Sequence, residues 1–320
     1  GPGQVKVTGG WIQGEVTEDL TIYKGIPFAA PPVGDLRWKA PQPVQPWEGV
    51  RDALEFGPGP VQGFGQSDQF SEDCLYLNVW TPAKSPKEKL PVLVWGNGAC
   101  SNSPWEHFKF LNEIASHGFL VVAIGHIPMT DERYKGPGSR SEQQIEGLEW
   151  ALAQNADKDS PYYGRIDVNA VAAAGMSCGG LQTLDNSRDP RLKTIMICNS
   201  GLFINPAGAM PGMPMPEKEK LQDIKVPVLY MLGGKEDIAY ENGMDDFHRL
   251  TKVPAFAANY PVGHAGTYAQ AHGGEFSVVA LAWLQWQLQG NEEAAKLFQG
   301  EPCGLSLREG WTVEKNSLID

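Results

Sequence analysis

The stretch at residues 172–180 constrains the fold of this chain more than any other. It is Ala-Ala-Ala-Gly-Met-Ser-Cys-Gly-Gly, a run of small apolar residues that ends in a Gly-x-Ser-x-Gly pattern around Ser177. If the run is a buried strand and a helix follows it, Ser177 lies on a sharp turn with its hydroxyl above the sheet. Such a turn requires glycine on either side of Met176-Ser177-Cys178, where this chain has Gly175 and Gly179. A Cβ atom at either position would press against the neighbouring strand or helix. With 37 glycines in the chain the pattern is weak alone, so its meaning depends on the residues around it.

Strand-like and helix-like segments alternate along most of the chain. Apolar runs typical of strands lie at 5–8, 20–23, 75–80, 90–95, 119–125, 168–174, 194–198, 226–232 and 255–260. Helical spacing is found at 108–117, at 141–154 with Ser141 as a candidate cap, and at 276–288, which is rich in tryptophan. This alternation predicts an α/β fold with a mostly parallel central sheet flanked by helices.

Two segments have no periodicity. Residues 126–140 are broken by glycine and proline, which predicts a surface loop. Residues 202–219 hold four prolines and three methionines. That composition is typical of an irregular, lid-like loop or a pocket wall, and a disordered connector is the alternative. No internal repeat and no interdomain linker is visible, so we expect a single domain.

The charge balance limits the partners of this chain. Its 26 Lys and Arg residues against 38 Asp and Glu residues give a formal net charge of −12 at pH 7. This charge repels polyanions, so neither nucleic acid nor an anionic membrane surface is an expected partner. No apolar run in the sequence approaches the roughly 20 residues that span a bilayer.

Gly1 and Pro2 are residues that a tag-removal protease leaves behind. Localisation therefore stays open, with a secreted or periplasmic protein that has lost its signal peptide as one option.

The five cysteines are Cys74, Cys100, Cys178, Cys198 and Cys303. They form no C-x-x-C pair and have no histidine spacing typical of zinc sites, so we expect neither a metal nor an organic cofactor. Their odd number leaves at least one free thiol in a monomer. We expect Cys178 and Cys198 to be buried and to serve as small apolar side chains.

Ser177 needs partners to act as a nucleophile, because a serine hydroxyl is unreactive at its ordinary pKa. A base must accept its proton, and a carboxylate must hold that base in the correct tautomer. Asp237 and His264 follow the strands expected at 226–232 and 255–260. Both would therefore emerge with Ser177 at the carboxyl edge of a parallel sheet, where ligands bind. The order Ser177, Asp237, His264 is also that of the catalytic triad in hydrolases with this type of turn.

Other residues compete for the two supporting roles. The alternatives are Glu236 and Glu241 for the acid, and His126, His248 and His272 for the base. Asp237 could also be an ordinary turn residue. We favour His264 as the base because Gly263 and Gly266 flank it directly after a strand.

The backbone near Ser177 is expected to bind the oxyanion of the reaction. Only the central residue of the turn points at the substrate, so Cys178 contributes its backbone N–H and not its thiol. A second donor comes from the loop after an earlier strand, and the small residues at 98–100 suit it. For the substrate, Trp105, Met176, Phe203 and the methionines of 210–215 predict an apolar acyl or alcohol pocket.

The first 95 residues resemble the type B carboxylesterases, the cholinesterase-like branch of the α/β hydrolases. The matching stretches are Tyr-Lys-Gly-Ile-Pro-Phe-Ala at 23–29, Pro-Val-Gly-Asp-Leu-Arg-Trp at 32–38 and Ser-Glu-Asp-Cys-Leu-Tyr-Leu-Asn-Val at 71–79. Residues 96–313 are instead similar to a smaller bacterial and fungal group of α/β hydrolases. The stretches of this chain that match that group are Gly-Asn-Gly-x-Cys at 96–100, Gly-x-Ser-Cys-Gly-Gly at 175–180, Asp-Ile-Ala-Tyr-Glu-Asn at 237–242 and Trp-Leu-x-Trp-Gln-Leu at 283–288. The chain is therefore a mosaic, natural or engineered, with its seam near Trp95 and Gly96.

The resemblance implies an α/β-hydrolase fold in a single domain at 1–320, in which residues 1–95 add strands to the edge of the same sheet. Alignment with the triple-glycine loop of type B enzymes assigns the loop donors to the N–H groups of Ala99 and Cys100, within about one residue. In many of these enzymes the cysteine that corresponds to Cys74 pairs with a cysteine a little upstream. Residues 57–60 of this chain contain no cysteine, so that disulfide cannot form here.

The activity that the resemblance implies is hydrolysis of a carboxylic ester through an acyl-enzyme on Ser177. The expected substrates are small to medium apolar, aryl or plant-cell-wall-type esters, free or linked to a polymer. Acyl transfer to another acceptor is one alternative. A catalytically inactive, cholinesterase-like binding module is another, but such modules typically lose one of the three residues that this chain retains. The oligomeric state stays open.

Overall fold

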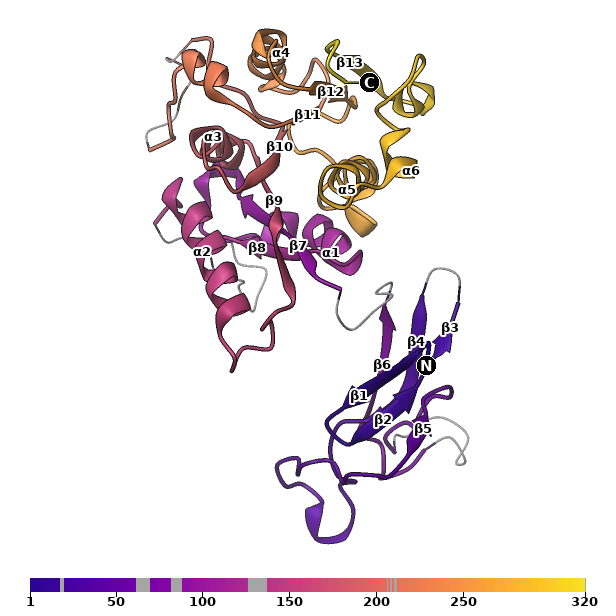
Figure 1. The fold of residues 1–320 in the computed structure, drawn as a ribbon. Helices are drawn as coiled ribbons and strands as arrows, with labels where there is room; N and C mark the ends of the chain where they lie inside the picture. Colours follow the sequence, from indigo (N-terminus) through magenta and orange to yellow (C-terminus); the bar gives the residue numbers. More distant parts are fainter. Residues whose placement is uncertain are drawn as a thin grey trace. The chain divides into compact units, whose positions relative to one another are not determined.

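The structure is a computed structural model that describes residues 1–17, 20–61, 70–81, 88–125, 137–205, 207, 209 and 212–319. Most of the loop expected at 126–140 and part of the segment at 202–219 therefore lie outside the described residues. The chain divides into two compact units, Gly1–Glu88 and Lys89–Asp320. Each unit has sheets of its own (Figure 1).

The first unit contains two three-stranded sheets. One consists of β1 (Gln4–Val7), β2 (Gly10–Gln13) and β5 (Val50–Asp52), and the other of β3 (Glu15–Val16), β4 (Thr21–Pro27) and β6 (Tyr76–Thr81). β1 pairs antiparallel with β2, and β4 pairs antiparallel with β6. Among the described residues of this unit, one small core cluster consists of the buried side chains of Ile12, Tyr23, Ile26 and Ala53.

These pairings correct the expectation that the strands at 75–80 and 90–95 belong to the same sheet. β6 pairs with β4, whereas β7 (Leu90–Gly96) pairs with β8 (Leu120–Ala123) and β9 (Ile166–Met176). A hydrogen bond of 2.8 Å from the Gly25 N–H to Asn78 Oδ1 also ties β4 to β6. Sheet membership depends on contacts between strands that are distant in sequence, so the pattern of each strand alone could not decide it.

The second unit contains a seven-stranded sheet in the order β13-β12-β11-β10-β9-β7-β8. Its remaining strands are β10 (Leu192–Cys198), β11 (Val228–Leu232), β12 (Ala255–Asn259) and β13 (Thr312–Lys315). β13 pairs antiparallel with β12, and the other pairs in this sheet are parallel. The mostly parallel sheet predicted from the sequence is therefore present.

Helices cover both faces of this sheet (Figure 1). Because successive residues of a strand point to opposite faces, Leu93 and Trp95 belong to one core and Val92 and Val94 to the other. The first core includes α1 (Phe108–Ser116) and α5 (Gly274–Gln289), and the second includes α2 (Glu142–Ala156), α3 (Cys178–Asp185) and α4 (Tyr240–Arg249). The short α6 (Glu292–Ala295) follows α5. In the part of the chain that the structure describes, no helix is long and apolar enough to cross a bilayer.

Two local features differ from the sequence expectations. α4 was not expected, because its polar sequence contains Gly243 and glycine disfavours a helix interior. The glycine is needed there, since a Cβ atom on Gly243 would lie 2.8 Å from the Ser200 carbonyl oxygen. Tight packing thus outweighs helix propensity in α4. At the start of α2, Ser141 has helical backbone angles and makes no capping hydrogen bond, so the expected cap is absent.

Candidate active site

Ser177 lies at the sharp turn between β9 and α3. Its φ of 53° and ψ of −115° are strained for a residue with a side chain. The turn brings the backbone of α3 close to two strands: a Cβ atom on Gly179 would lie 2.1 Å from the Gly96 carbonyl oxygen, and one on Gly175 would lie 2.2 Å from the Gly179 carbonyl oxygen. Close backbone packing therefore requires both glycines of the Gly-x-Ser-x-Gly pattern.

Three residues predicted from the sequence come together at the carboxyl edge of the sheet. Asp237 follows β11, and His264 follows β12. His264 Nδ1 is 2.6 Å from Asp237 Oδ1, and His264 Nε2 is 3.0 Å from Ser177 Oγ. An ionised carboxylate can only accept hydrogen bonds, so Nδ1 carries the ring proton and Nε2 accepts from the serine hydroxyl. The imidazole is thus oriented to receive the Ser177 proton.

Asp237 is 3% exposed, and both of its oxygens accept hydrogen bonds. Besides His264, the donors are the N–H groups of Ala239 and Gly233, each at 2.9 Å, and Asn199 Nδ2 at 2.7 Å. Burial alone would raise the pKa of Asp237, but these hydrogen bonds outweigh it and hold the pKa below its ordinary value. The carboxylate is therefore ionised at neutral pH.

The competing acids and bases lie elsewhere. Glu236 and Glu241 are exposed. His272 is exposed and its Nδ1 lies 2.9 Å from Glu113 Oε2, and His248 is exposed with its Nε2 3.0 Å from Glu314 Oε2. His126 lies outside the described residues.

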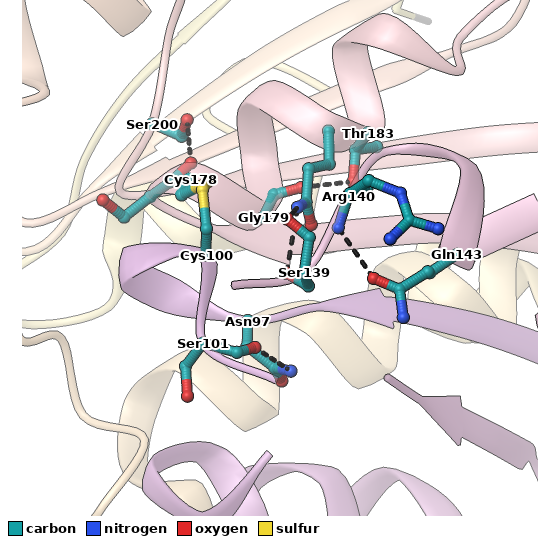
Figure 2. Close-up of a disulfide and its surroundings, with 12 residues drawn as sticks. Asn97, Cys100, Ser101, Ser139, Arg140, Gln143, Cys178, Gly179, Thr183 and Ser200 are labelled. Atoms are coloured by element: carbon teal, nitrogen blue, oxygen red, sulfur yellow. Dashed lines mark hydrogen bonds between the residues drawn. A yellow bond between two sulfur atoms is a disulfide. The ribbon is translucent and has the colours of Figure 1, made fainter. Parts of the chain in front are cut away.

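A disulfide joins the loop after β7 to the start of α3, as Figure 2 shows. It links Cys100, in the short 3₁₀ turn η3 (Gly98–Cys100), to Cys178, the first residue of α3. The expectation of a free, apolar Cys178 side chain was therefore wrong, while Cys198 is free and buried as expected. The pair could not be predicted from spacing, because 78 residues separate the two cysteines.

The same loop carries unused hydrogen-bond donors. Ala99 and Cys100 have left-handed backbone angles, with φ of 51° and 49°. Among the hydrogen bonds of the described residues, none uses the backbone N–H of Ala99, Cys100 or Cys178. Ala99 also lines the pocket that contains Ser177. The Ala99 N–H is therefore a free donor on a residue that lines the Ser177 pocket.

Ser177 and His264 line a pocket of about 520 Å³. Most of its other lining residues are apolar, among them Met176, Leu181, Phe203, Met213 and Ile238. Of the residues expected to bind substrate, Met176 and Phe203 therefore lie in this pocket. Met210 lies outside the described residues.

Trp105 does not line the pocket of Ser177. It lines a neighbouring pocket of about 480 Å³, together with Phe108. The two rings are stacked, with centroids 5.5 Å apart and planes 10° from parallel. Met176 and Glu106 border both pockets. Trp105 therefore lies in the pocket next to that of Ser177, and not in the Ser177 pocket where the sequence predicted it.

Asn199, Ser200 and Tyr268 support the site, although none of them was among the residues predicted from the sequence. Asn199 Nδ2 donates to Asp237 Oδ2 at 2.7 Å, and its Oδ1 accepts from the Tyr268 hydroxyl at 2.6 Å. Ser200 Oγ donates to the Ser177 carbonyl oxygen at 2.7 Å, beside the disulfide in Figure 2. Asn199 and Ser200 directly follow β10, so their place at the carboxyl edge of the sheet was an available signal. Tyr268 had no such signal.

Two protein-family models match this chain. The model of the carboxylesterase family matches residues 2–125, and the model of PET hydrolase-like proteins matches residues 99–286. The two matches overlap at 99–125, just after the seam expected near Trp95 and Gly96. The mosaic of a carboxylesterase-like part and a smaller hydrolase part is therefore confirmed.

Curated proteins similar to this chain are named as esterases and other hydrolases. Phenmedipham hydrolase of Pseudarthrobacter oxydans is 34% identical over 188 residues, which is 54% of this chain and 37% of that protein. Carboxylesterase 1E of Mus musculus is 31% identical over 248 residues, covering 68% of this chain and 42% of that protein. Fumonisin B1 esterase of Sphingopyxis macrogoltabida is 39% identical over 124 residues, covering 37% of this chain and 23% of that protein. The chain thus spans less than half the length of these curated relatives.

Both matching families have the α/β-hydrolase fold, in agreement with the seven-stranded, mostly parallel sheet and its flanking helices. Residues 99–286 make up more than half of the chain and include Ser177, Asp237 and His264. The chain therefore belongs to the PET hydrolase-like family of α/β hydrolases.

Proposed function

We propose that this chain hydrolyses carboxylic esters, with Ser177 as nucleophile, His264 as general base and acid, and Asp237 as the residue that orients His264. The observation that carries the proposal is the pair of hydrogen bonds made by His264, 3.0 Å to Ser177 Oγ and 2.6 Å to Asp237 Oδ1. The names of the relatives, which are carboxylesterases and esterases, agree with it.

In the first half of the reaction, Ser177 Oγ attacks the carbonyl carbon of the ester while its proton moves to His264 Nε2. The imidazolium that forms is stabilised by the ionised Asp237 carboxylate beside Nδ1. His264 then protonates the departing alcohol, which leaves the acyl group on Ser177. In the second half, His264 takes a proton from water, the hydroxyl attacks the acyl carbon, and the proton returns to Ser177 Oγ.

The negative oxygen of each tetrahedral intermediate would be bound by backbone N–H groups. Ala99 and Cys100 offer donors from the loop, and Cys178 offers one from the first turn of α3. Two observations support this role: the three N–H groups make no other hydrogen bond among the described residues, and the start of a helix favours negative charge. Donors that are in place before the reaction cost no reorganisation when charge develops.

The pocket supports apolar and aryl esters as the substrate class. Phe203, Met213 and Ile238 offer mainly apolar contact, and about 520 Å³ suits a small to medium acyl or alcohol group. The ester could be free or linked to a polymer such as a plant cell-wall polysaccharide.

Replacement of the nucleophile tests the proposal. We expect Ser177→Ala to lower kcat for p-nitrophenyl butyrate by about 10⁴- to 10⁶-fold while the circular dichroism spectrum is retained. A fluorophosphonate should label the wild-type protein and not the variant. Ser116→Ala, at the exposed end of α1, is the matched control and should behave as wild type. Retention of more than about a tenth of the activity by Ser177→Ala would contradict the assignment.

A further inference from the structure

We propose that the Cys100–Cys178 disulfide is a positioning element of the oxyanion hole, which holds the loop donors at a fixed separation from the donor of α3. This inference rests on the proposed function, because it concerns the part of the protein that would keep the proposed donors aligned. Neither cysteine takes part in the chemistry through its sulfur.

The disulfide acts directly on the donors because each cysteine carries one of them. Cys178 follows Ser177 in sequence, and Cys100 follows Ala99 in the loop. Their Cα atoms are 5.2 Å apart, and disulfide geometry confines this separation to about 4.4–6.8 Å. The two N–H groups therefore cannot drift far apart while the bond is intact. Figure 2 shows the bond crossing from the loop to the first turn of α3.

The loop needs such a restraint because its backbone is strained. Ala99 and Cys100 both have left-handed angles, which disfavour residues with a Cβ atom. Asn97 Nδ2 holds the base of the loop through hydrogen bonds to the carbonyl oxygens of Ser101 at 2.9 Å and Ile124 at 2.8 Å. These bonds shape the loop, but they do not tie it to α3.

The non-covalent connection between the loop and α3 is indirect. Among the described residues, no hydrogen bond runs from 97–101 directly to α3. Ser139 bridges the two: its N–H donates to the Cys100 carbonyl oxygen at 2.6 Å, and its own oxygens accept from Gln182 Nε2 at 3.1 and 3.0 Å. The bridge ends at a carbonyl group, so it leaves the direction of the N–H groups less constrained than the disulfide does.

Neither cysteine lines the pocket that contains Ser177. Cys100 is 8% exposed and Cys178 is fully buried, whereas Ala99 and Ser177 line the pocket. Loss of the bond should therefore leave substrate contacts unchanged and displace only the groups that stabilise the oxyanion. Since the oxyanion exists only near the transition state, the expected change is in kcat and not in KM.

A double-mutant cycle in the full chain tests the inference. We expect Cys100→Ala, Cys178→Ala and the double variant each to lower kcat by about 10- to 100-fold, with KM changed by less than about threefold. The double variant should be no worse than either single variant, because each single change already breaks the same bond. Cys303→Ala removes a buried free cysteine and is the matched control, with kcat unchanged.

Inhibition by a transition-state analogue distinguishes this role from a purely structural one, because a disulfide that only stabilised the fold would not affect the inhibition constant. An aryl trifluoromethyl ketone forms a hemiketal with Ser177 and places an oxyanion in the hole, so its inhibition constant should rise in parallel with the fall in kcat. All assays are run well below the melting temperature of each variant. Variants that melt earlier but keep the wild-type kcat and inhibition constant would overturn the inference, as would effects that multiply in the double variant.

If the variants do not fold, the inference can be tested instead on the wild-type chain with its disulfide reduced to two thiols. Purified under a phosphine reductant, it should show five thiols where the oxidised protein shows three. The phosphine gives two electrons to the disulfide, and one water molecule supplies both the oxygen atom of the phosphine oxide and the two protons of the new thiols. The same fall in kcat, reversed by oxidised glutathione, supports the inference, and an unchanged kcat overturns it. An oxidised wild-type protein without esterase activity would instead refute the proposed function itself.

Discussion

At the scale of single residues, the candidate site depends on how a buried carboxylate keeps its charge. Asp237 receives four hydrogen bonds, from His264, Asn199 and two backbone N–H groups. They keep the pKa of Asp237 below its ordinary value in spite of the burial that acts to raise it. An ionised Asp237 fixes the proton of His264 on Nδ1, which leaves Nε2 free to act as the base.

Asp237→Asn should therefore lower kcat at pH 7 by about 10³- to 10⁴-fold, because an amide can donate to His264 Nδ1 and stabilise the wrong tautomer. The thermal stability should fall much less than the activity does. Glu236→Gln and Glu241→Gln change the exposed neighbouring acids and serve as controls, with kcat unchanged. If either control loses activity to the same degree as Asp237→Asn, the acid has been assigned to the wrong residue.

At the scale of elements, α4 anchors the segment that forms one wall of the pocket. Asp246 of α4 is fully buried and accepts hydrogen bonds from the Leu202 N–H at 2.7 Å and from Lys218 Nζ at 2.6 Å. Leu202 and Lys218 flank the part of the chain that contributes Phe203 and Met213 to the pocket. The described residues of this segment thus serve as the pocket wall that the sequence predicted as one of its options.

Burial raises the pKa of Asp246 to about 6, although Lys218 acts to lower it. Because the carboxyl group holds its proton more tightly in the folded than in the unfolded chain, the native state binds more protons between about pH 4 and pH 6. A rise in pH through this window therefore favours unfolding. The expected loss of stability from this group is on the order of 3 kcal/mol.

Asp246→Asn should remove this dependence on pH. The free energy of unfolding of wild type minus that of the variant should decrease as the pH rises from 4 to 7, measured by urea denaturation at each pH. Asp245→Asn is the neighbouring control. The pKa of Asp245 is lowered to about 2, mainly by its hydrogen bond with Arg249, so Asp245 stays ionised in the native state across this range. Its contribution to stability should therefore rise slightly near pH 4 and not fall. A difference that is constant with pH for Asp246→Asn would contradict the prediction.

At the scale of the whole molecule, the two units have separate cores. The buried side chains of the first unit are few, whereas both cores of the second unit consist of residues from Val92 onward. The strands of the first unit pair only with one another among the described residues. A core as small as that of the first unit supplies little stability by itself.

We therefore expect the fragment 89–320 to fold, to react with a fluorophosphonate at Ser177 and to show the melting transition of the larger unit in calorimetry. The full chain should show a second, weaker transition from residues 1–88. An insoluble fragment would contradict this expectation.

The sequence carried enough information to predict the turn at Ser177, the order of the candidate triad and the mostly parallel sheet. These features follow from local properties: apolar runs of strand length, glycines where backbones approach closely, and polar residues directly after strands. Asp237 and His264 could be selected because the carboxyl ends of parallel strands meet at one edge whatever the details of packing.

Only the tertiary structure decided which distant residues meet. The disulfide joins cysteines that are 78 residues apart, Asn199 contacts both Asp237 and Tyr268, and Trp105 lies in the pocket next to the one predicted. The sheets of residues 1–88 were likewise decided by strand pairing and not by the pattern of any one strand. A contact between two residues depends on the path of all the chain between them, and no local pattern records that path.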